Sequence, residues 1–393
     1  MLKYIFQLTL ICNCFFSTTF AQKVNQSNAF KEAESQVLQM LQEVKDISDS
    51  PRFFPRTFEH DTLKLVASKD WTSGFWPGIL WMMYENSGKE IFNTNARYYT
   101  SLMVKELTNN DSHDVGFKVY CSYGQAYRLT NEAVYKEAII KAAATLCTRF
   151  NSRIGCIRSW NAKGRAIGWA YPVIIDNMMN LELLFEATKL SNDSTFYNIA
   201  VSHANTTLKN HYRANFSSYH VVDYDTATGN VIKKNTAQGY ADESSWARGQ
   251  AWGLYGFTMC YRETNNPVYL QQAEAIAGYI LNNPNLPADM IPYWDYDMPD
   301  KSTAPRDVSA ATITASALYE LSGYSKNSKK YLQAANKILN NVIKSYRSPL
   351  PSNHGFILLH STGHKPVDSE VDVPIIYADY YYLEALMRSK KLK

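Results

Sequence analysis

The sequence predicts an all-α fold, a single (α/α)6 toroid in which six helical hairpins form a ring. Two observations predict this fold class. Hydrophobic residues recur with the 3.6-residue period of an amphipathic helix over twelve segments, and one kind of helix–turn–helix junction recurs along the chain. The polar segments between hairpins are long, and in a ring they would gather at one end of the inner helices. We therefore expect these segments to form the walls of a cleft.

The twelve predicted helices pair at similar junctions. Each junction ends a helix, turns through Asn, Ser, Thr or Gly, and begins the next helix with an aromatic residue that packs back over the turn. These aromatic residues are Phe92, Tyr135, Tyr197, Tyr269 and Tyr331. The predicted helices span residues 27–45, 73–88, 90–109, 116–129, 132–150, 174–190, 194–211, 245–264, 266–282, 308–323, 327–346 and 372–388. Within the segment before the eighth helix, 225–239 resembles a small hairpin.

The N-terminal residues have the pattern of a cleaved secretory signal peptide: an early Lys3, an apolar run and a small residue at the end. Cleavage near Ala21 predicts an exported protein, periplasmic or secreted, with no membrane anchor and one domain over 22–393. Export permits disulfides, and Cys147 with Cys156 is the favoured pair. Free buried thiols explain the same cysteines equally well.

Composition narrows the kinds of ligand. The net charge of +4, from 40 basic and 36 acidic residues, lacks the basic footprint of nucleic-acid-binding proteins. Aromatic residues make up 13% of the 393 residues, with 28 Tyr and 8 Trp. Because Tyr and Trp combine an apolar face with a polar edge, this surplus favours an aromatic-lined sugar cleft, and large loosely packed helices are the alternative. The chain contains no serine-hydrolase elbow, phosphate loop, dinucleotide fingerprint or helical metal motif, so we expect no cofactor or metal.

Two Asp residues stand at the starts of predicted apolar helices. Asp176 lies within PVIIDNMMNLELLFEA, where burial would raise its pKa and allow it to act as a general acid. Asp114 follows His113 at the start of another apolar helix. Because equivalent positions in a ring converge, we expect both carboxylates in one cleft, as in glycoside-cleaving enzymes. For each Asp, an ordinary helix N-cap is the alternative.

A third segment, ESSWARGQAWGLYGF, places Arg248 and Trp252 four residues apart and hence on one helix face. This pair suits an acidic sugar, because Arg binds carboxylates and Trp stacks on sugar rings. A structural cation–π contact is the alternative. His220 and Gln238, in the long segment before this helix, are candidate hydrogen-bond donors. Trp76, in DWTSGFWPG, belongs either to a ligand platform or to the core.

These motifs, with HDVGF and SEVDVPIIYADYYYLEALMR, resemble those of the unsaturated glucuronyl hydrolases, glycoside hydrolase family 88, in the family's order from about 70 to 388. The resemblance implies a hydrolase that removes a 4,5-unsaturated uronic acid from the non-reducing end of oligosaccharides left by polysaccharide lyases, glycosaminoglycan disaccharides in particular. Protonation at C4 and addition of water at C5 would release the aglycone. The sister family that acts on unsaturated rhamnogalacturonan disaccharides is an alternative, as is a non-catalytic toroid that binds acidic sugars.

The resemblance also implies residue roles. Asp176 matches the family's general acid/base, and Asp114 matches a second essential Asp that contacts the ring hydroxyls. The residues that match substrate contacts are His113, His220, Gln238, Arg248 and Trp252. Ser361 and Lys365 match in part the residues that bind a sulfate in other members, and a solvated loop is the alternative there. An unsaturated uronyl oligosaccharide is the expected partner, and the oligomeric state stays open.

Overall fold

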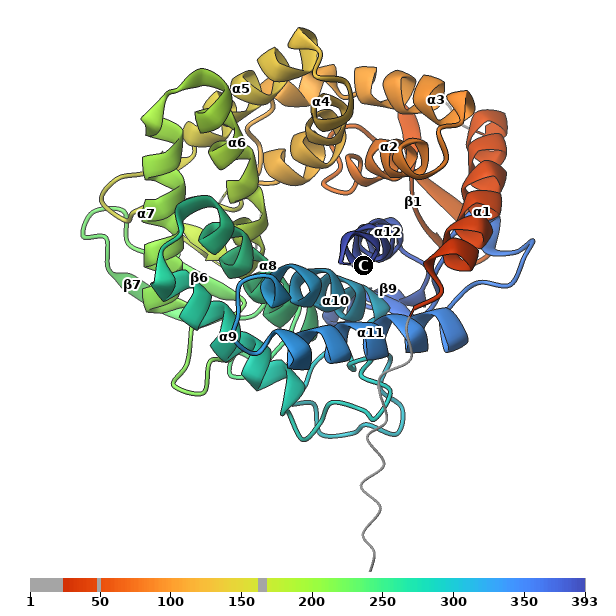
Figure 1. Ribbon diagram of the computed structural model, residues 1–393. Coiled ribbons are helices and arrows are strands. Elements are labelled where there is room, and N and C mark those ends of the chain that lie inside the picture. Colours follow the sequence, from red (N-terminus) through yellow and green to blue (C-terminus); the bar gives the residue numbers. More distant parts are fainter. Residues whose placement is uncertain (1–23, 48–50, 162–167, 393) are drawn as a thin grey trace, which may run out of the picture.

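A computed structural model of the protein describes residues 24–47, 51–161 and 168–392. The predicted signal peptide lies outside the described residues. The described chain is mainly helical, and Figure 1 shows its helices arranged around a centre, with the odd-numbered helices outside and the even-numbered ones inside. The outer helices are α1 (Gln26–Ile47), α3 (Glu90–Ser101), α5 (Ala133–Cys147), α7 (Ser194–Asn210), α9 (Pro267–Leu281) and α11 (Ser328–Ser345). The inner helices are α2 (Phe75–Ser87), α4 (Gln125–Thr130), α6 (Leu181–Ser191), α8 (Ala247–Thr264), α10 (Val308–Ser322) and α12 (Ile376–Lys391).

Each predicted helix corresponds to one of these twelve, but three of them contain a change of helix type. The predicted helix 90–109 continues after α3 as a separate 3-10 helix, η1 (Val104–Thr108). The predicted helix 116–129 begins as a π-helix, η2 (Gly116–Gly124), and the predicted helix 174–190 begins as a 3-10 helix, η3 (Ile175–Asn180). The inner elements contact one another in a closed circuit, from α2 through η2, α6, α8, α10 and α12 back to α2.

The turns inside four hairpins have the same local cause. Asn131, Asn192 and Asn265 end α4, α6 and α8 in the left-handed backbone region, with φ of 57°, 60° and 53°. Gly88 ends α2 in the same way, with φ of 68°. Each residue donates its N–H to the carbonyl four residues earlier. Asn and Gly tolerate this conformation better than other residues, which explains their place in the junction pattern.

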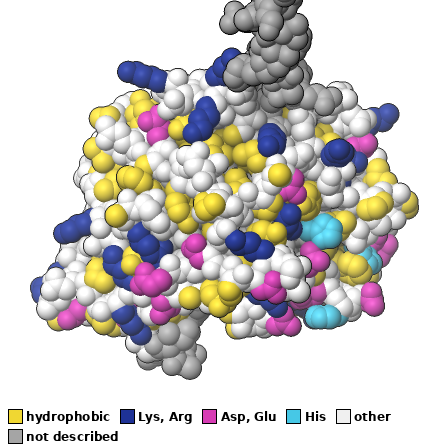
Figure 2. Space-filling model, turned by 90° about the horizontal axis from the view of Figure 1, so that it is seen from below, with side chains coloured by type: hydrophobic (Ala, Val, Ile, Leu, Met, Phe, Trp, Pro, Cys, Tyr) yellow, Lys and Arg dark blue, Asp and Glu magenta, His cyan; other side chains and the backbone are white. Residues whose placement is uncertain are grey.

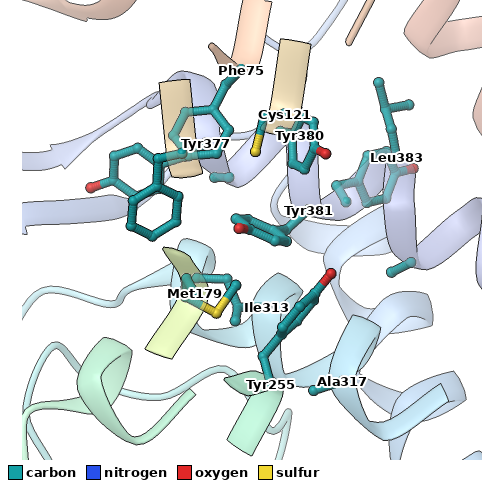
Figure 3. Packing of buried hydrophobic residues seen from close by; sticks show 14 of the residues in the cluster. Phe75, Cys121, Met179, Tyr255, Ile313, Ala317, Tyr377, Tyr380, Tyr381 and Leu383 are labelled. Carbon is teal, nitrogen blue, oxygen red and sulfur yellow. The ribbon is translucent and has the colours of Figure 1, made fainter. Parts of the chain in front are cut away.

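Aromatic side chains form a large part of the core between the inner helices. Figure 3 shows Phe75 close to Tyr377, Tyr380 and Tyr381, and its ring centroid lies 5.2 Å from that of Tyr380. The predicted hairpin aromatics also pack inside: Phe92, Tyr135, Tyr269 and Tyr331 are buried, and Tyr197 is half-buried. Much of the aromatic surplus is therefore structural.

Four small antiparallel sheets amend the all-α expectation, and they lie in the long segments between hairpins. Their strands are β1 (Arg52–Glu59) with β2 (Thr62–Ala67), β3 (Phe150–Asn151) with β4 (Cys156–Ile157), β5 (Pro172–Ile174) with β6 (Val221–Tyr224) and β7 (Val231–Asn235), and β8 (Ser361–His364) with β9 (Ser369–Val373). Two short 3-10 helices, η4 (Asn353–Gly355) and η5 (Lys365–Val367), accompany them. The hairpin predicted at 225–239 is the β6–β7 pair, displaced toward the N-terminus.

The four cysteines within the described residues are all free, so the disulfide between Cys147 and Cys156 does not form. Cys147 ends α5, whereas the Cys156 thiol lies 4.0 Å from the carbonyl oxygen of His203 on α7. No described helix is long and apolar enough to cross a bilayer. On the face that Figure 2 presents, basic and acidic side chains are intermingled, as the small net charge predicts.

Candidate active site

A cavity of about 210 Å³ contains both candidate carboxylates, and segments from all parts of the chain form its walls. Of the residues predicted from the sequence, His113, Asp114, Asp176, Gln238 and Arg248 line it. The two Asp residues therefore converge as the ring prediction required.

Asp176 enters the cavity where β5 changes into η3. Its side chain is 13% exposed, and burial raises the pKa of this carboxyl to about 7. The charge of Arg248 opposes the shift, and the charge of Asp114 adds to it. The N-cap residue of η3 is Ile174, and Asp176 is the second residue of that helix. Asp176 is thus the desolvated acid that the sequence predicted rather than an N-cap.

His220 faces Asp176 with a defined ring nitrogen. Its Nδ1 accepts hydrogen bonds from the backbone N–H groups of Ala237 and Gln238, both at 3.1 Å, so the proton of the neutral ring belongs on Nε2. The Nε2 atom lies 3.7 Å from Asp176 Oδ2. The ring also packs on Trp246, with centroids 4.5 Å apart. His220 therefore presents an N–H group toward Asp176.

Asp114 and His113 form a second polar pair in the cavity. His113 Nε2 lies 3.3 Å from Asp114 Oδ1, and its Nδ1 lies 3.3 Å from the hydroxyl of Ser159. That hydroxyl accepts the N–H of Ile174 at 2.9 Å, which leaves its proton for His113 Nδ1. His113 Nε2 is then the nitrogen that donates toward Asp114, so the imidazole orients the carboxylate.

A close backbone contact connects the two Asp-bearing segments. Asn180, at the end of η3, accepts the N–H of Phe117 in η2 at 3.0 Å through its side chain. A Cβ atom on Gly116 would lie 2.5 Å from Asn180 Cα, so only glycine fits there. The spacing between the Asp114 and Asp176 segments depends on this contact.

Arg248 is 1% exposed, and its contacts differ from the predicted ones. It forms an ion pair with Asp307 at 2.7 Å and donates to the carbonyl oxygens of Thr362 and Gly363 at 2.6 and 2.5 Å. Its guanidinium lies over the ring of Trp246, 4.5 Å from the centroid. The indole under the guanidinium is thus that of Trp246 and not that of Trp252, because helical spacing does not determine the direction in which a long side chain extends.

Five predicted substrate contacts lie outside the cavity lining: His220, Trp252, Trp76, Ser361 and Lys365. Trp252 is fully buried between Phe117 and Tyr381, with ring centroids 5.2 and 5.4 Å away. Trp76 is also in the core, where it packs against Tyr99. Ser361 is fully buried in β8, and Lys365 is 38% exposed and paired with Asp368 at 2.9 Å.

Trp71, Trp160 and Tyr377 supply the aromatic wall of the cavity. Trp71 and Tyr377 belong to the motifs DWTSGFWPG and SEVDVPIIYADYYYLEALMR. The sequence did not mark Trp160 or Arg56 as site candidates, because each stands singly in a long polar segment. Arg56 forms an ion pair with Glu370 and a second one with Asp70 at 2.7 Å, and so connects β1 with β9.

A mainly helical fold whose cavity combines two carboxylates, one with a raised pKa, with a buried Arg and aromatic walls defines a carbohydrate-active hydrolase. The chain belongs to glycosyl hydrolase family 88, whose model matches residues 47–388. It is 50% identical to an unsaturated glucuronyl hydrolase of Formosa agariphila over 343 residues, which cover 86% of this chain and 85% of that protein.

Two solved structures show the same likeness in three dimensions. The crystal structure of an unsaturated glucuronyl hydrolase specific for heparin superposes with a TM-score of 0.89 and 44% identity, over 94% of this chain and 98% of the other. An Asp-to-Asn variant of the Streptococcus agalactiae enzyme, in complex with dGlcA-GalNAc6S, superposes with a TM-score of 0.78 and 29% identity, over 95% and 93% of the chains.

Proposed function

We propose that this protein is an unsaturated glucuronyl hydrolase, which removes the 4,5-unsaturated uronic acid from the non-reducing end of lyase-generated oligosaccharides. The observation that carries this proposal is the Asp176 carboxyl, whose burial raises its pKa to about 7 next to a second carboxylate. Family membership and the similar proteins support the same substrate class.

The proposed reaction begins with a proton because the unsaturated sugar is a vinyl ether. Neutral Asp176 donates this proton to C4, and positive charge develops at C5 and the ring oxygen. Water adds to C5 and loses a proton to the Asp176 carboxylate, which restores the acid. The hemiketal then opens and releases the aglycone. One group serves as acid and then as base, so a raised pKa suits both steps.

The neighbouring residues support this chemistry by position and charge. We propose that Asp114, oriented by His113, accepts hydrogen bonds from the ring hydroxyls of the uronic acid. The buried positive charge of Arg248 attracts the substrate carboxylate. The ion pair between Arg248 and Asp307, at 2.7 Å, holds the guanidinium in place. The His220 N–H faces Asp176 Oδ2 at 3.7 Å, so it supports the negative charge that the carboxylate carries after it has given up its proton. Gln238 lines the same wall, but its side-chain N–H donates to Gly363 O at 3.0 Å, which leaves its carbonyl oxygen for substrate.

The substrates we propose to test first are glycosaminoglycan fragments, since two similar proteins are described with heparin and with dGlcA-GalNAc6S. Lys365, partly exposed in η5 next to the cavity residue His364, is the side chain that we propose to meet a sulfate on the adjoining sugar. The closed circuit of inner helices supports an (α/α)6 toroid, and the N-terminal pattern of residues 1–21 supports export to the periplasm or the medium.

The test follows the loss of absorbance from the conjugated double bond in unsaturated disaccharides of chondroitin, heparin and rhamnogalacturonan. We expect turnover of a glycosaminoglycan disaccharide by the wild type. We expect Asp176→Asn to keep the fold and substrate binding but to lose roughly 10²–10⁴ in rate, the contribution of a positioned acid/base. Circular dichroism verifies the fold.

Three outcomes would contradict this proposal. Turnover confined to the rhamnogalacturonan disaccharide would favour the sister activity, and binding without turnover would favour a sugar-binding toroid. Normal rates in Asp176→Asn would remove that residue from the role of acid.

A further inference from the structure

A second cavity, of about 430 Å³, lies next to the active-site wall. Trp160 lines the active-site cavity, whereas Arg158 and Asn161 in the same short segment line the second one. Neighbouring residues of a chain have Cα atoms only about 3.8 Å apart. The two cavities therefore lie on opposite sides of this one backbone segment.

Two arginine side chains, Arg149 and Arg158, line this second cavity. Arg149 is 6% exposed. It donates through Nε to the carbonyl oxygen of Arg158 at 2.8 Å, and through Nη1 to the carbonyl oxygen of Asn110 and to Asn161 Oδ1. Arg158 Nη2 donates to the same Asn161 oxygen at 3.1 Å. The Nη2 atom of Arg149 and the Nε atom of Arg158 are buried without a hydrogen-bond partner.

Neither guanidinium has a counter-ion in the parts of the chain that the structure describes, because no carboxylate lies within ion-pair distance. Residues 162–167, which are not described, contain no Asp or Glu. Burial, and then the charge of Arg158, lower the pKa of Arg149 to about 10, while Asp114 and Asp111 oppose this shift from beyond ion-pair distance. Two like charges thus lie together without neutralisation.

The local sequence shows the same excess of positive charge. From residue 138 to residue 175 the chain contains no Asp or Glu. The basic residues of this stretch are Lys141, Arg149, Arg153, Arg158, Lys163 and Arg165. This stretch is exceptional, because the net charge of the whole chain is only +4. Stretches with charges of one sign are typical of anion-binding surfaces.

We propose that Arg149 and Arg158 form an oxyanion site whose ligand is a sulfate or carboxylate group. Two neighbouring cations without a counter-ion, one of them buried, raise the free energy of the fold, and a bound oxyanion offsets this cost through charge-assisted hydrogen bonds. The group comes from one of two sources: an oligosaccharide that extends past Trp160 from the active site, or a free inorganic ion. The first source rests on the proposed function, and the second does not.

The experiment has two arms and uses the full chain with a matched pair of variants. Arg158→Gln removes a cavity cation, and Arg153→Gln removes an exposed cation of the same basic run that does not line the cavity. In the first arm, calorimetry measures sulfate binding at constant ionic strength. We expect Arg158→Gln to weaken it about tenfold or more, and Arg153→Gln to leave it unchanged. Arg149→Lys, which keeps the charge but loses the planar fork, should weaken it as well.

In the second arm, KM is measured for an unsaturated sulfated disaccharide and for the matching tetrasaccharide. A higher KM in Arg158→Gln for the tetrasaccharide alone identifies the oligosaccharide as the source of the anion. Weaker sulfate binding with unchanged tetrasaccharide kinetics identifies a free ion. Equal behaviour of Arg158→Gln and Arg153→Gln in both arms overturns the proposal. A wild type that fails to turn over the disaccharide contradicts the proposed function instead, and the sulfate arm still decides the oxyanion site.

Discussion

At the scale of single residues, the proposed chemistry rests on two carboxylates, Asp114 and Asp176, that line the same cavity. Both side chains are mostly buried, and burial is the main reason that the pKa of Asp176 is raised. Part of the shift comes from the negative charge of Asp114. The pKa of the acid is therefore a property of both segments.

This coupling predicts the pH dependence of an Asp114→Asn variant. The acid must be protonated, so wild-type kcat/KM should fall as pH rises through about 7. Removal of the Asp114 charge lowers the Asp176 pKa, so the fall should begin at lower pH in the residual activity of the variant. The pH–rate profile measures this shift, and Asp111→Asn, at an exposed position, serves as the control. An unchanged or higher midpoint would exclude the coupling.

Sequence reasoning at this scale succeeded where local surroundings decide. The apolar neighbours of Asp176 along the chain correctly indicated its burial. The burial of Trp252 could not be predicted in the same way. Whether this side chain faces a sugar or the core depends on Phe117 and Tyr381, which come from other elements.

At the scale of elements, the π-helix η2 and the 3-10 helix η3 hold the two Asp residues in register. Both irregular helices occur where regular α-helices were predicted, since hydrophobic periodicity does not distinguish these helix types. Irregular turns of this kind are frequent at functional sites. Their contact at Gly116 and Asn180 leaves no room for a side chain.

We therefore predict that Gly116→Ala destabilises the fold and impairs catalysis together. The added methyl group forces η2 away from η3, at a cost of about 1–3 kcal/mol for overpacking. Displacement of a carboxylate by about 1 Å should lower kcat up to about 10²-fold. Urea unfolding and steady-state kinetics measure the two effects.

Gly278→Ala provides the control for this prediction. A Cβ atom at Gly278, on outer helix α9, meets nothing within 4 Å. This change should leave kcat unaltered and stabilise the helix by at most about 1 kcal/mol. If both variants behave alike, the contact between η2 and η3 does not position the carboxylates.

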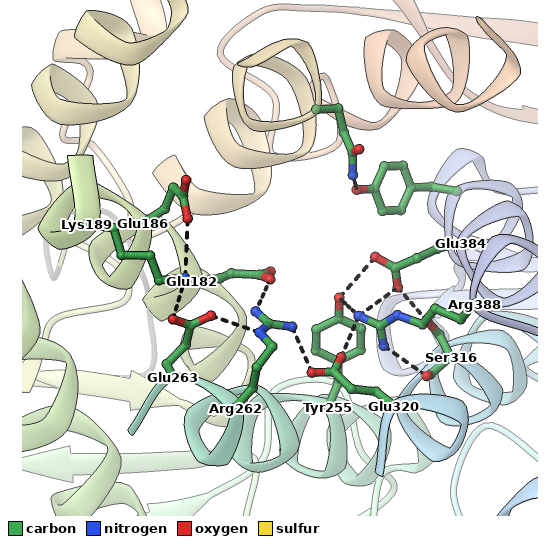
Figure 4. Close-up of polar contacts among 12 residues, drawn as sticks. Glu182, Glu186, Lys189, Tyr255, Arg262, Glu263, Ser316, Glu320, Glu384 and Arg388 are labelled. Atoms are coloured by element: carbon green, nitrogen blue, oxygen red, sulfur yellow. Dashed lines mark hydrogen bonds and ion pairs between the residues drawn. The ribbon is translucent and has the colours of Figure 1, made fainter. Parts of the chain in front are cut away.

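At the scale of the whole molecule, ion pairs connect four inner helices around a third cavity, of about 320 Å³. Figure 4 shows Arg262 of α8 between Glu182 of α6 and Glu320 of α10. Arg388 of α12 also binds Glu320, at 2.6 Å, and donates to the Tyr255 hydroxyl at 2.9 Å. The network thus joins α6, α8, α10 and α12, and the lining of this cavity contains neither Asp114 nor Asp176.

This arrangement predicts that Arg388→Gln separates stability from catalysis. Loss of the Arg388 guanidinium leaves the mostly buried Glu320 with Arg262 as its remaining ion-pair partner. This loss should lower the free energy of unfolding by roughly 3 kcal/mol. The kcat of the folded protein should not change, because the network excludes the proposed catalytic groups. Arg97→Gln is the matched control, since Arg97 and Glu132 are each 39% exposed and such pairs contribute below about 1 kcal/mol. Equal destabilisation by both variants would contradict a structural role for the network.

The sequence by itself determined the helices, their turns and the neighbourhood of both Asp residues, because hydrophobic periodicity and the left-handed tolerance of Asn and Gly act over a few residues. Only the tertiary structure decided which side chains meet. Arg56 pairs with Glu370, and Arg248 pairs with Asp307, because burial and charge compensation depend on segments far apart in the chain. The same reason explains why Arg149 and Arg158 were found together only in the folded protein.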